Sequence, residues 1–323
     1  MRRQLPLFIT IAVFLAGYAI CLAQFPSFAS TRVIANLLTD NAFLGIVAVG
    51  MTFVIISGGI DLSVGSVIAF TGVFIAITTE HYGISPWAAF VLILGLAAGF
   101  GAGMGFIIQT FQIPAFIVTL AGMFLARGLS FVLTTDSIPI NAPLYGEVTD
   151  MALIMPGGGR LSVIAVVMLL VTAVGMVLLH STRFGANVYA LGGNRTSAEL
   201  MGVPVGRTTV QIYTLSSVLA ALSGIVFSFY TSAGYSLAAT GVELDTIAAV
   251  VIGGTLLTGG YGTIFGTFVG ILIQGLIQTY ITFEGTLSSW WTKIAIGALL
   301  FAFIALQRGL TLLSARGSAA LRA

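Results

Sequence analysis

The stretch STRFGANVYALGGNRTSAELMGVPVGR, at 181–207, separates two strongly apolar halves of the chain. It is the longest polar passage at a predicted cytoplasmic position. Its middle, 194–201, has the signals of a short helix, because Asn194 or Thr196 can cap the first turn and Gly202 can end the last one. A helix this polar would face water rather than lipid. We interpret the stretch as the place where a factor outside the membrane acts on the protein; an ordinary connecting loop is the alternative.

The composition predicts an all-α polytopic membrane protein. Hydrophobic residues make up 58% of the 323 residues and charged residues only 7%, against about 25% charged in soluble proteins. The apolar runs are long and do not alternate, which excludes barrel strands. The net charge of +2 gives no indication of nucleic-acid binding. We expect a single transmembrane domain over 1–323.

The apolar runs predict about ten membrane spans, since about 20 apolar residues cross a bilayer. They are expected at 5–23, 41–57, 62–79, 87–109, 114–134, 161–180, 208–232, 242–257, 263–283 and 291–306. Eight or nine spans remain possible, because only glycine turns separate the second from the third and the eighth from the ninth. A cleaved signal peptide is the alternative for the first run. A short interfacial helix or loop is expected at 27–40, and a long polar loop at 135–160.

The basic residues orient these spans. Eight of the twelve fall in the N-terminal segment, the central loop and the tail 307–323: Arg2, Arg3, Arg183, Arg195, Arg207, Arg308, Arg316 and Arg322. Basic residues favour the cytoplasmic side of a bacterial inner membrane. Both termini are therefore expected in the cytoplasm, and the loop 135–160 in the periplasm.

Two glycine-rich interruptions break the apolar halves. The first, GGIDLSVGS at 58–66, carries a carboxylate at membrane depth, where a charge is costly and usually faces a cavity or the protein interior. Asp61 either caps the next span at the cytoplasmic rim, by accepting from the amides of Ser63 and Val64, or has a substrate or gating role. The second interruption spans 253–262. The candidate path or gate residues are Gly58, Gly59, Asp61, Ser63, Ser66, Gly259 and Gly260.

Glycines at every fourth position predict close helix packing. One ladder runs through Gly262, Gly266 and Gly270, and another is spaced in the same way at 95, 99 and 103. Both interruptions fall on the cytoplasmic side in this count. The second to fifth and the seventh to tenth spans would then form two four-helix sets of opposite orientation, an inverted repeat of the kind found in transporters.

The residues that enzymes and metal sites require are scarce. The single lysine, Lys293, follows Thr292, so the chain has no phosphate-binding Gly-Lys-Ser/Thr loop. Two histidines far apart and one cysteine give no metal-ligand cluster. We expect neither an enzyme nor a cofactor. Few ionisable residues lie within the spans, so the energy for any transport is expected to come from a partner.

Three blocks in order resemble the ribose-type family of monosaccharide ABC importer permeases. They are GGIDLSVGS at 58–66, TRFGANVYALGGNRTSAELMGV at 182–203, and ELDTIAAVVIGGTLLTGGYGTIFGT at 243–267. More narrowly, the stretches at 39–74 and 277–310 resemble permeases of bacterial galactofuranose importers. The resemblance implies an ATP-driven importer with an ABC ATPase, a second homologous permease in a heterodimer, and a periplasmic sugar-binding protein.

The resemblance places the coupling to the ATPase in the central block. The residues expected to carry it are Gly192, Gly193, Asn194, Ala198, Glu199, Met201 and Gly202. Movement of this segment would open and close a central pathway by alternating access. Two alternatives remain: a permease for ribose, xylose or branched-chain amino acids, and an ion-coupled secondary carrier that acts alone.

Overall fold

The computed structural model describes residues 5–288 and 290–320. Arg2, Arg3 and Arg322, and with them part of the predicted basic tail, lie outside the described residues. The tail is otherwise part of a long terminal helix, and the side chains of Arg308 and Arg316 also lie outside the description.

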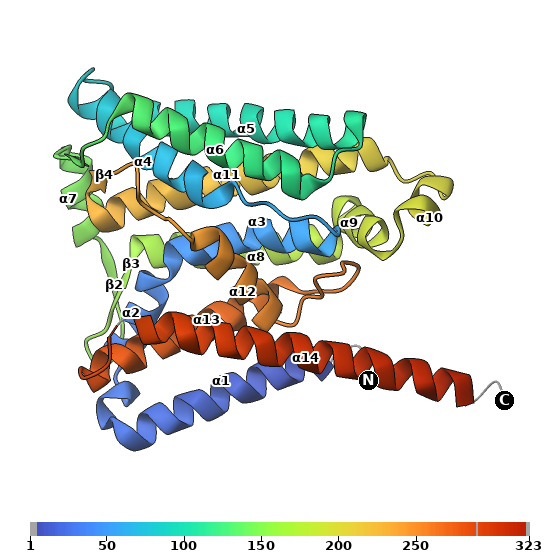
Figure 1. Cartoon of the computed structure of the whole chain (residues 1–323). Helices are drawn as coiled ribbons and strands as arrows, with labels where there is room; N and C mark the ends of the chain where they lie inside the picture. Colours follow the sequence, from blue (N-terminus) through green and yellow to red (C-terminus); the bar gives the residue numbers. More distant parts are fainter. Residues whose placement is uncertain (1–4, 289, 321–323) are drawn as a thin grey trace.

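Most helices run along one common axis, which gives the molecule two ends (Figure 1). In chain order the elements are α1 Leu5–Gln24, η2 Pro26–Ala29, α2 Thr31–Asp40, α3 Ala42–Ile56, α4 Val64–Glu80, α5 Pro86–Phe111, α6 Ala115–Leu133, β1 Ile138–Pro139, α7 Pro143–Asp150, β2 Ala152–Ile154, β3 Arg160–Ser162, α8 Val163–Ser181, α9 Arg183–Gly193, α10 Arg195–Leu200, α11 Val205–Thr231, β4 Ala233–Gly234, α12 Val242–Ile252, α13 Ile264–Glu284 and α14 Trp290–Ala320. We call the two ends the α7 end and the α10 end.

The helices confirm the all-α polytopic fold. Among the described residues, six helices are long and apolar enough to cross a membrane, and α2 with α3, bent by 54°, gives a seventh. The shorter apolar helices α4 and the first part of α14 coincide with two further predicted spans. The predicted span at 242–257 is only partly helical: α12 has 11 residues, about 16 Å at 1.5 Å per residue, and cannot cross the ~30 Å hydrocarbon layer alone.

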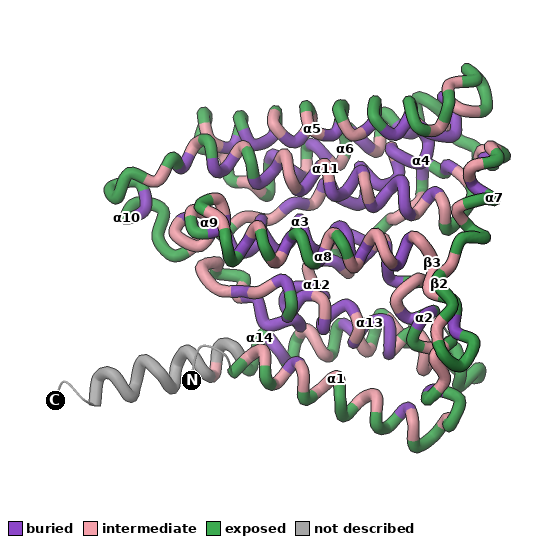
Figure 2. The backbone as a smooth tube through the Cα atoms, turned by 180° about the vertical axis from the view of Figure 1, so that it is seen from behind, coloured by how far each residue is buried: buried purple, intermediate pink, exposed green. Residues whose placement is uncertain are grey.

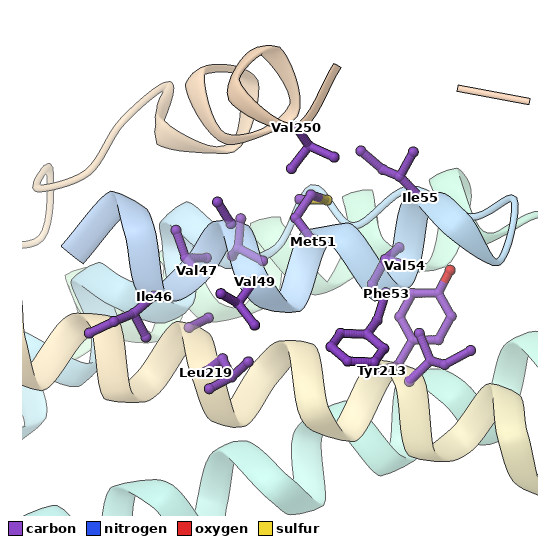
Figure 3. Close-up of a cluster of buried hydrophobic side chains, with 14 of the residues drawn as sticks. Ile46, Val47, Val49, Met51, Phe53, Val54, Ile55, Tyr213, Leu219 and Val250 are labelled. Atoms are coloured by element: carbon purple, nitrogen blue, oxygen red, sulfur yellow. The ribbon is translucent and has the colours of Figure 1, made fainter. Parts of the chain in front are cut away.

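Helix α3 forms the centre of the bundle because its sequence, AFLGIVAVGMTFVII, is apolar on every side. Side chains of α3 such as Ile46, Phe53 and Val54 meet Tyr213 and Leu219 of α11 (Figure 3). Figure 2 shows α3 largely buried, whereas α1 is mostly intermediate or exposed. The most apolar helix is therefore enclosed by protein, and the peripheral helices face the surroundings.

One predicted glycine ladder is confirmed and the other is wrong. Methyl groups added at Gly266 and Gly270 would lie 2.1 Å from the carbonyl oxygens of Gly253 and Ala249, so α12 packs directly on this face of α13. Among the described residues, no atom of another element lies within 4 Å of the corresponding positions at Gly95, Gly99 and Gly103. Helix α5 instead meets α11 through a stripe two residues further along, at 97, 101 and 105, because the sequence spacing alone does not say which small-residue face turns inward.

The polar loop 135–160 is ordered rather than irregular. β1 pairs with β4, which follows α11, so Ile138 lies opposite Gly234. β2 and β3 form a hairpin, and α7 lies between the two pairs in sequence. Tyr145 of α7 is buried against the bundle, and its hydroxyl lies 2.8 Å from the Ser228 hydroxyl. These contacts hold the α7 end as a structured cap.

The α12–α13 contact provides a test of the packing. Replacing Gly266 with Ala is expected to destabilise the protein by about 1–3 kcal/mol, because the added methyl group meets backbone that cannot rotate away. Gly99→Ala, the matched control on the open face of α5, is expected to change stability by less than ~0.5 kcal/mol. Thermal unfolding of the detergent-solubilised protein measures both, and equal melting temperatures for the two variants would contradict this packing.

Candidate functional site

The predicted short helix in the central polar stretch is present as α10. The Asn194 side chain accepts a hydrogen bond of 2.8 Å from the Ser197 amide, so Asn194, and not Thr196, is the cap. The helix ends where Gly202 adopts a φ of +80°, which an L-residue rarely tolerates. The preceding polar residues also form a helix, α9, which the sequence analysis did not predict.

Helix α10 buries one small side chain, is joined to Gln109 of α5 by a hydrogen bond from Arg195, and exposes an apolar tip. Ala198 is 0% exposed within the core, while Leu200 and Met201 are 85% and 73% exposed. Glu199 also faces outward. Exposed apolar side chains beside a charge are typical of a contact site for another protein. Leu200 was missed by the sequence reasoning, although an apolar residue next to Met201 in a polar helix was the signal for it.

Five of the predicted residues meet in what we call the glycine junction: Gly58, Gly192, Gly193, Gly259 and Gly260. The Gly260 amide donates to the Ile56 carbonyl at 2.8 Å. A methyl group on Gly192 would lie 1.7 Å from the same oxygen, and one on Gly259 would lie 2.9 Å from the Gly58 nitrogen. The ends of α9 and α3 and the loop 253–263 are therefore in backbone contact, which joins the predicted coupling and gate residues.

Tyr189 of α9 strengthens this junction. Its hydroxyl donates a 2.6 Å hydrogen bond to the Gly262 carbonyl. Burial, with a smaller contribution from Tyr261, raises the pKa of Tyr189 to about 12. The hydroxyl therefore stays protonated near neutral pH and remains a donor.

From the junction, the extended linker 57–63 turns back into the bundle and carries Asp61 to mid-depth. Asp61 is fully buried, and its Oδ1 accepts from the Ser63 amide at 2.9 Å and from the Ser63 hydroxyl at 2.6 Å. Its Oδ2 accepts from Ser216 at 2.8 Å, near the midpoint of the 27-residue α11. The expected position at the cytoplasmic rim is wrong. Capping of Ser63 is confirmed, whereas Val64 is not a donor to Asp61 among the described residues.

A second non-helical linker, 235–241, consists mostly of turns, enters the bundle from the α7 end and leads into α12. Arg127 of α6 donates to the carbonyls of Ser236 and Ala238, at 2.6 and 2.8 Å. The Ser236 hydroxyl donates back to the Ser130 and Thr134 carbonyls, at 3.0 and 2.6 Å. Such partners are required because water does not satisfy backbone groups at this depth. The sequence analysis gave Arg127 no role.

Helix α6 also holds the first linker, and the two short helices meet. Thr119 donates to the Ile60 carbonyl at 3.3 Å. A methyl group on Gly65, in the first turn of α4, would lie 2.3 Å from Oε2 of Glu243, in the first turn of α12. The N-terminal ends of α4 and α12 therefore converge near the Glu243 carboxylate. The partial positive charge of a helix N-terminus stabilises a negative group at this place. Ser66, also in α4, is buried, and its hydroxyl has no hydrogen-bond partner among the described residues.

The non-helical linkers 57–63 and 235–241 correspond to each other, which corrects the expected pairing of 58–66 with 253–262. In each case, a helix running towards one end is followed by a non-helical linker and a short helix: α3, 57–63 and α4, and then α11, 235–241 and α12. Figure 1 shows both short helices starting inside the bundle and running to opposite ends. The counterpart of 58–66 is therefore 235–241 rather than 253–262. A two-fold axis relating the halves stays a prediction.

The site residues form a connected series of contacts through the bundle. The described residues contain no group of three His, Cys, Asp or Glu side chains that could hold a metal ion. The contacts run without a break from α10 through the glycine junction and the linker 57–63 to the place where α4 and α12 meet.

Comparisons with known proteins show the family of this chain. The family model described as "Branched-chain amino acid transport system / permease component" matches residues 33–304. The chain is 65% identical to the inner membrane ABC transporter permease protein YjfF of Escherichia coli (strain K12), over 97% of this chain and 95% of that protein. It is 36% identical to the fructose import permease protein FruG of Bifidobacterium longum (strain NCC 2705), over 95% and 92%. It is 38% identical to the ribose import permease protein RbsC of Bacillus subtilis (strain 168), over 88% and 87%. No solved structure matches the chain.

The serines of α11 test the position of Asp61. Ser216→Ala removes one donor from a fully buried carboxylate and is expected to lower the free energy of unfolding by about 1–3 kcal/mol. Ser217→Ala is the matched control, because the neighbouring hydroxyl is buried without a partner among the described residues. Thermal unfolding in detergent compares them, and a control as destabilised as Ser216→Ala would argue against the Asp61 contact.

Proposed function

This chain belongs to the family of transport-system permease components, a family of multi-pass inner-membrane ABC permease subunits, and we propose that it is the permease subunit of an ATP-driven monosaccharide importer whose cargo is galactofuranose. Relatives named as ribose and fructose import permeases support the sugar class. The galactofuranose assignment rests on the resemblance of 39–74 and 277–310 to such permeases.

The observation that carries the proposal is the connection between α10 and the interior. An ATPase that binds the exposed Leu200 and Met201 would pull on a helix whose Ala198 is locked in the core. The movement reaches the Ile56 carbonyl through Gly192 and Gly260, and then the linker 57–63. Coupling by Gly192, Gly193, Asn194, Ala198, Glu199, Met201 and Gly202 is part of this proposal, as is gating by Gly58, Gly59, Asp61, Ser63, Ser66, Gly259 and Gly260.

The partners follow from the two ends of the molecule. The ATPase would bind the α10 end in the cytoplasm, where both termini are placed by this proposal. A periplasmic sugar-binding protein would dock on the α7 end, where the ordered segment 135–160 carries Asp136, Glu147 and Asp150. A second, homologous permease would complete a heterodimer in the lipid bilayer.

Uptake by the reconstituted importer tests the cargo. Proteoliposomes with ATP inside and the binding protein outside are expected to accumulate labelled galactofuranose in preference to ribose, xylose, fructose and branched-chain amino acids. Preference for one of the other compounds would contradict the galactofuranose assignment. Uptake that survives removal of ATP but is abolished by a protonophore would instead indicate an ion-coupled carrier.

Leu200 tests the coupling role. Leu200→Ser is expected to lower co-purification of the ATPase and ATP-driven uptake by about tenfold, because an apolar contact side chain is lost. Its exposure predicts an unchanged melting temperature. The control Leu287→Ser changes an exposed leucine at the other end of the bundle, away from the proposed ATPase contact, and is expected to retain co-purification of the ATPase. Full uptake and ATPase binding by Leu200→Ser would remove α10 from the coupling path.

A further inference from the structure

A cavity of about 540 Å³ lies between α3, α11, α12, α13 and α14. Small-molecule sites typically enclose ~300–1,000 Å³. Its walls come from residues near the α7 end, including Asp40 at the end of α2, Tyr230 near the end of α11 and Trp290 at the start of α14. Its inner end reaches Asp245 in the first turn of α12. The cavity therefore runs from the α7 end toward the short helices.

The lining combines aromatic rings with planar polar groups. Trp290, Tyr230 and Phe227 offer ring faces. Gln274 and Gln278 offer amides that both donate and accept. A monosaccharide presents apolar C–H faces and a rim of hydroxyls that also donate and accept, so both parts of this lining match it. A purely apolar ligand would leave the amides and carboxylates without partners.

Several polar groups are already fixed in place. The Gln274 side chain, 3% exposed, donates to the Asp245 carbonyl at 3.0 Å. The Asp245 carboxylate pairs with Lys293. Preorganised groups reduce the entropy lost when a ligand binds.

The charge of the lining favours an uncharged sugar over an anionic lipid headgroup as the ligand. The lining contains two carboxylates, Asp40 and Asp245, and one ammonium group, Lys293. The net negative charge disfavours the phosphate of an anionic phospholipid, whereas an uncharged sugar is unaffected.

The cavity also adjoins the moving part of the molecule. Asp245 lines it, and Glu243, two residues earlier in the same turn of α12, faces Gly65 of α4 on the other side. A ligand in the cavity would contact the helix whose first turn packs on α4.

We propose that this cavity is a binding site for an uncharged monosaccharide within a single permease chain, through Trp290, Tyr230, Gln274, Gln278 and the Asp245–Lys293 pair. The inference rests on the proposed import of a sugar and names where that sugar is held. In this proposal, α12 is the helix that contacts the bound sugar and responds to it.

Protection of an introduced cysteine tests the site in the purified importer complex. With the single native cysteine removed by Cys21→Ala, Thr292→Cys places a thiol in the cavity wall, and Thr286→Cys, an exposed control, places one outside it. Methyl galactofuranoside is expected to slow maleimide labelling of Thr292→Cys at least about fivefold, in a saturable manner, and to leave Thr286→Cys unchanged. Mass spectrometry of this chain quantifies the labelling.

A second pair of substitutions, in the Thr292→Cys background, tests the aromatic wall. Trp290→Ala is expected to raise the sugar concentration for half-protection about tenfold, whereas Trp87→Ala, an exposed tryptophan outside the cavity, is expected to leave it unchanged. Protection by added phosphatidylglycerol but not by the sugar, or no protection by either, would overturn the inference. If the importer takes up sugar with ATP but the sugar does not protect Thr292→Cys, the binding site in the cavity is contradicted and the proposed function is not. If the importer takes up no sugar, the proposed function is contradicted.

Discussion

The structure depends on one constraint: backbone groups of non-helical chain inside the bundle must find partners within the protein. Two linkers, 57–63 and 235–241, meet it in the same way, through side chains of neighbouring helices. Arg127 and Ser236 join the second linker to α6, and Thr119 joins the first linker to the same helix. Asp61, held by Ser63 and Ser216, ties the first linker to α11. Without these bonds, neither α4 nor α12 could begin inside the bundle.

This arrangement separates a rigid part from a movable one. The α12–α13 contact is backbone against backbone and leaves little room for sliding. The linker 57–63 is held by a few side-chain bonds and is continuous with the glycine junction, where Gly192 and Gly260 meet the end of α3. A displacement of α10 therefore has a route of backbone contacts to the linker through the glycine junction, in addition to the core contact of Ala198. In the proposed importer, this is how a partner's ATP cycle is transmitted to the pathway.

The sequence predicted the helical class, most spans and the α10 helix, because each depends on local signals: apolar runs, a capping asparagine and a terminating glycine. It misplaced Asp61, since the depth of a residue in a broken span depends on the direction of the linker after the break. The sequence also predicted close packing at Gly95, Gly99 and Gly103, which face outward. The spacing of small residues is the same on two faces of α5 and does not reveal which face packs. Arg127 and Ser216 gained roles only from contacts across more than 100 positions of sequence.

Hydrogen–deuterium exchange of the importer complex, with and without ATP bound to its ATPase, tests the central claim most directly. The account predicts that amide exchange in the linker 57–63 changes with nucleotide, while the α12–α13 contact around Gly266 and Gly270 exchanges at an unchanged rate. Identical exchange of the linker in both states, in a complex that still transports, would contradict it.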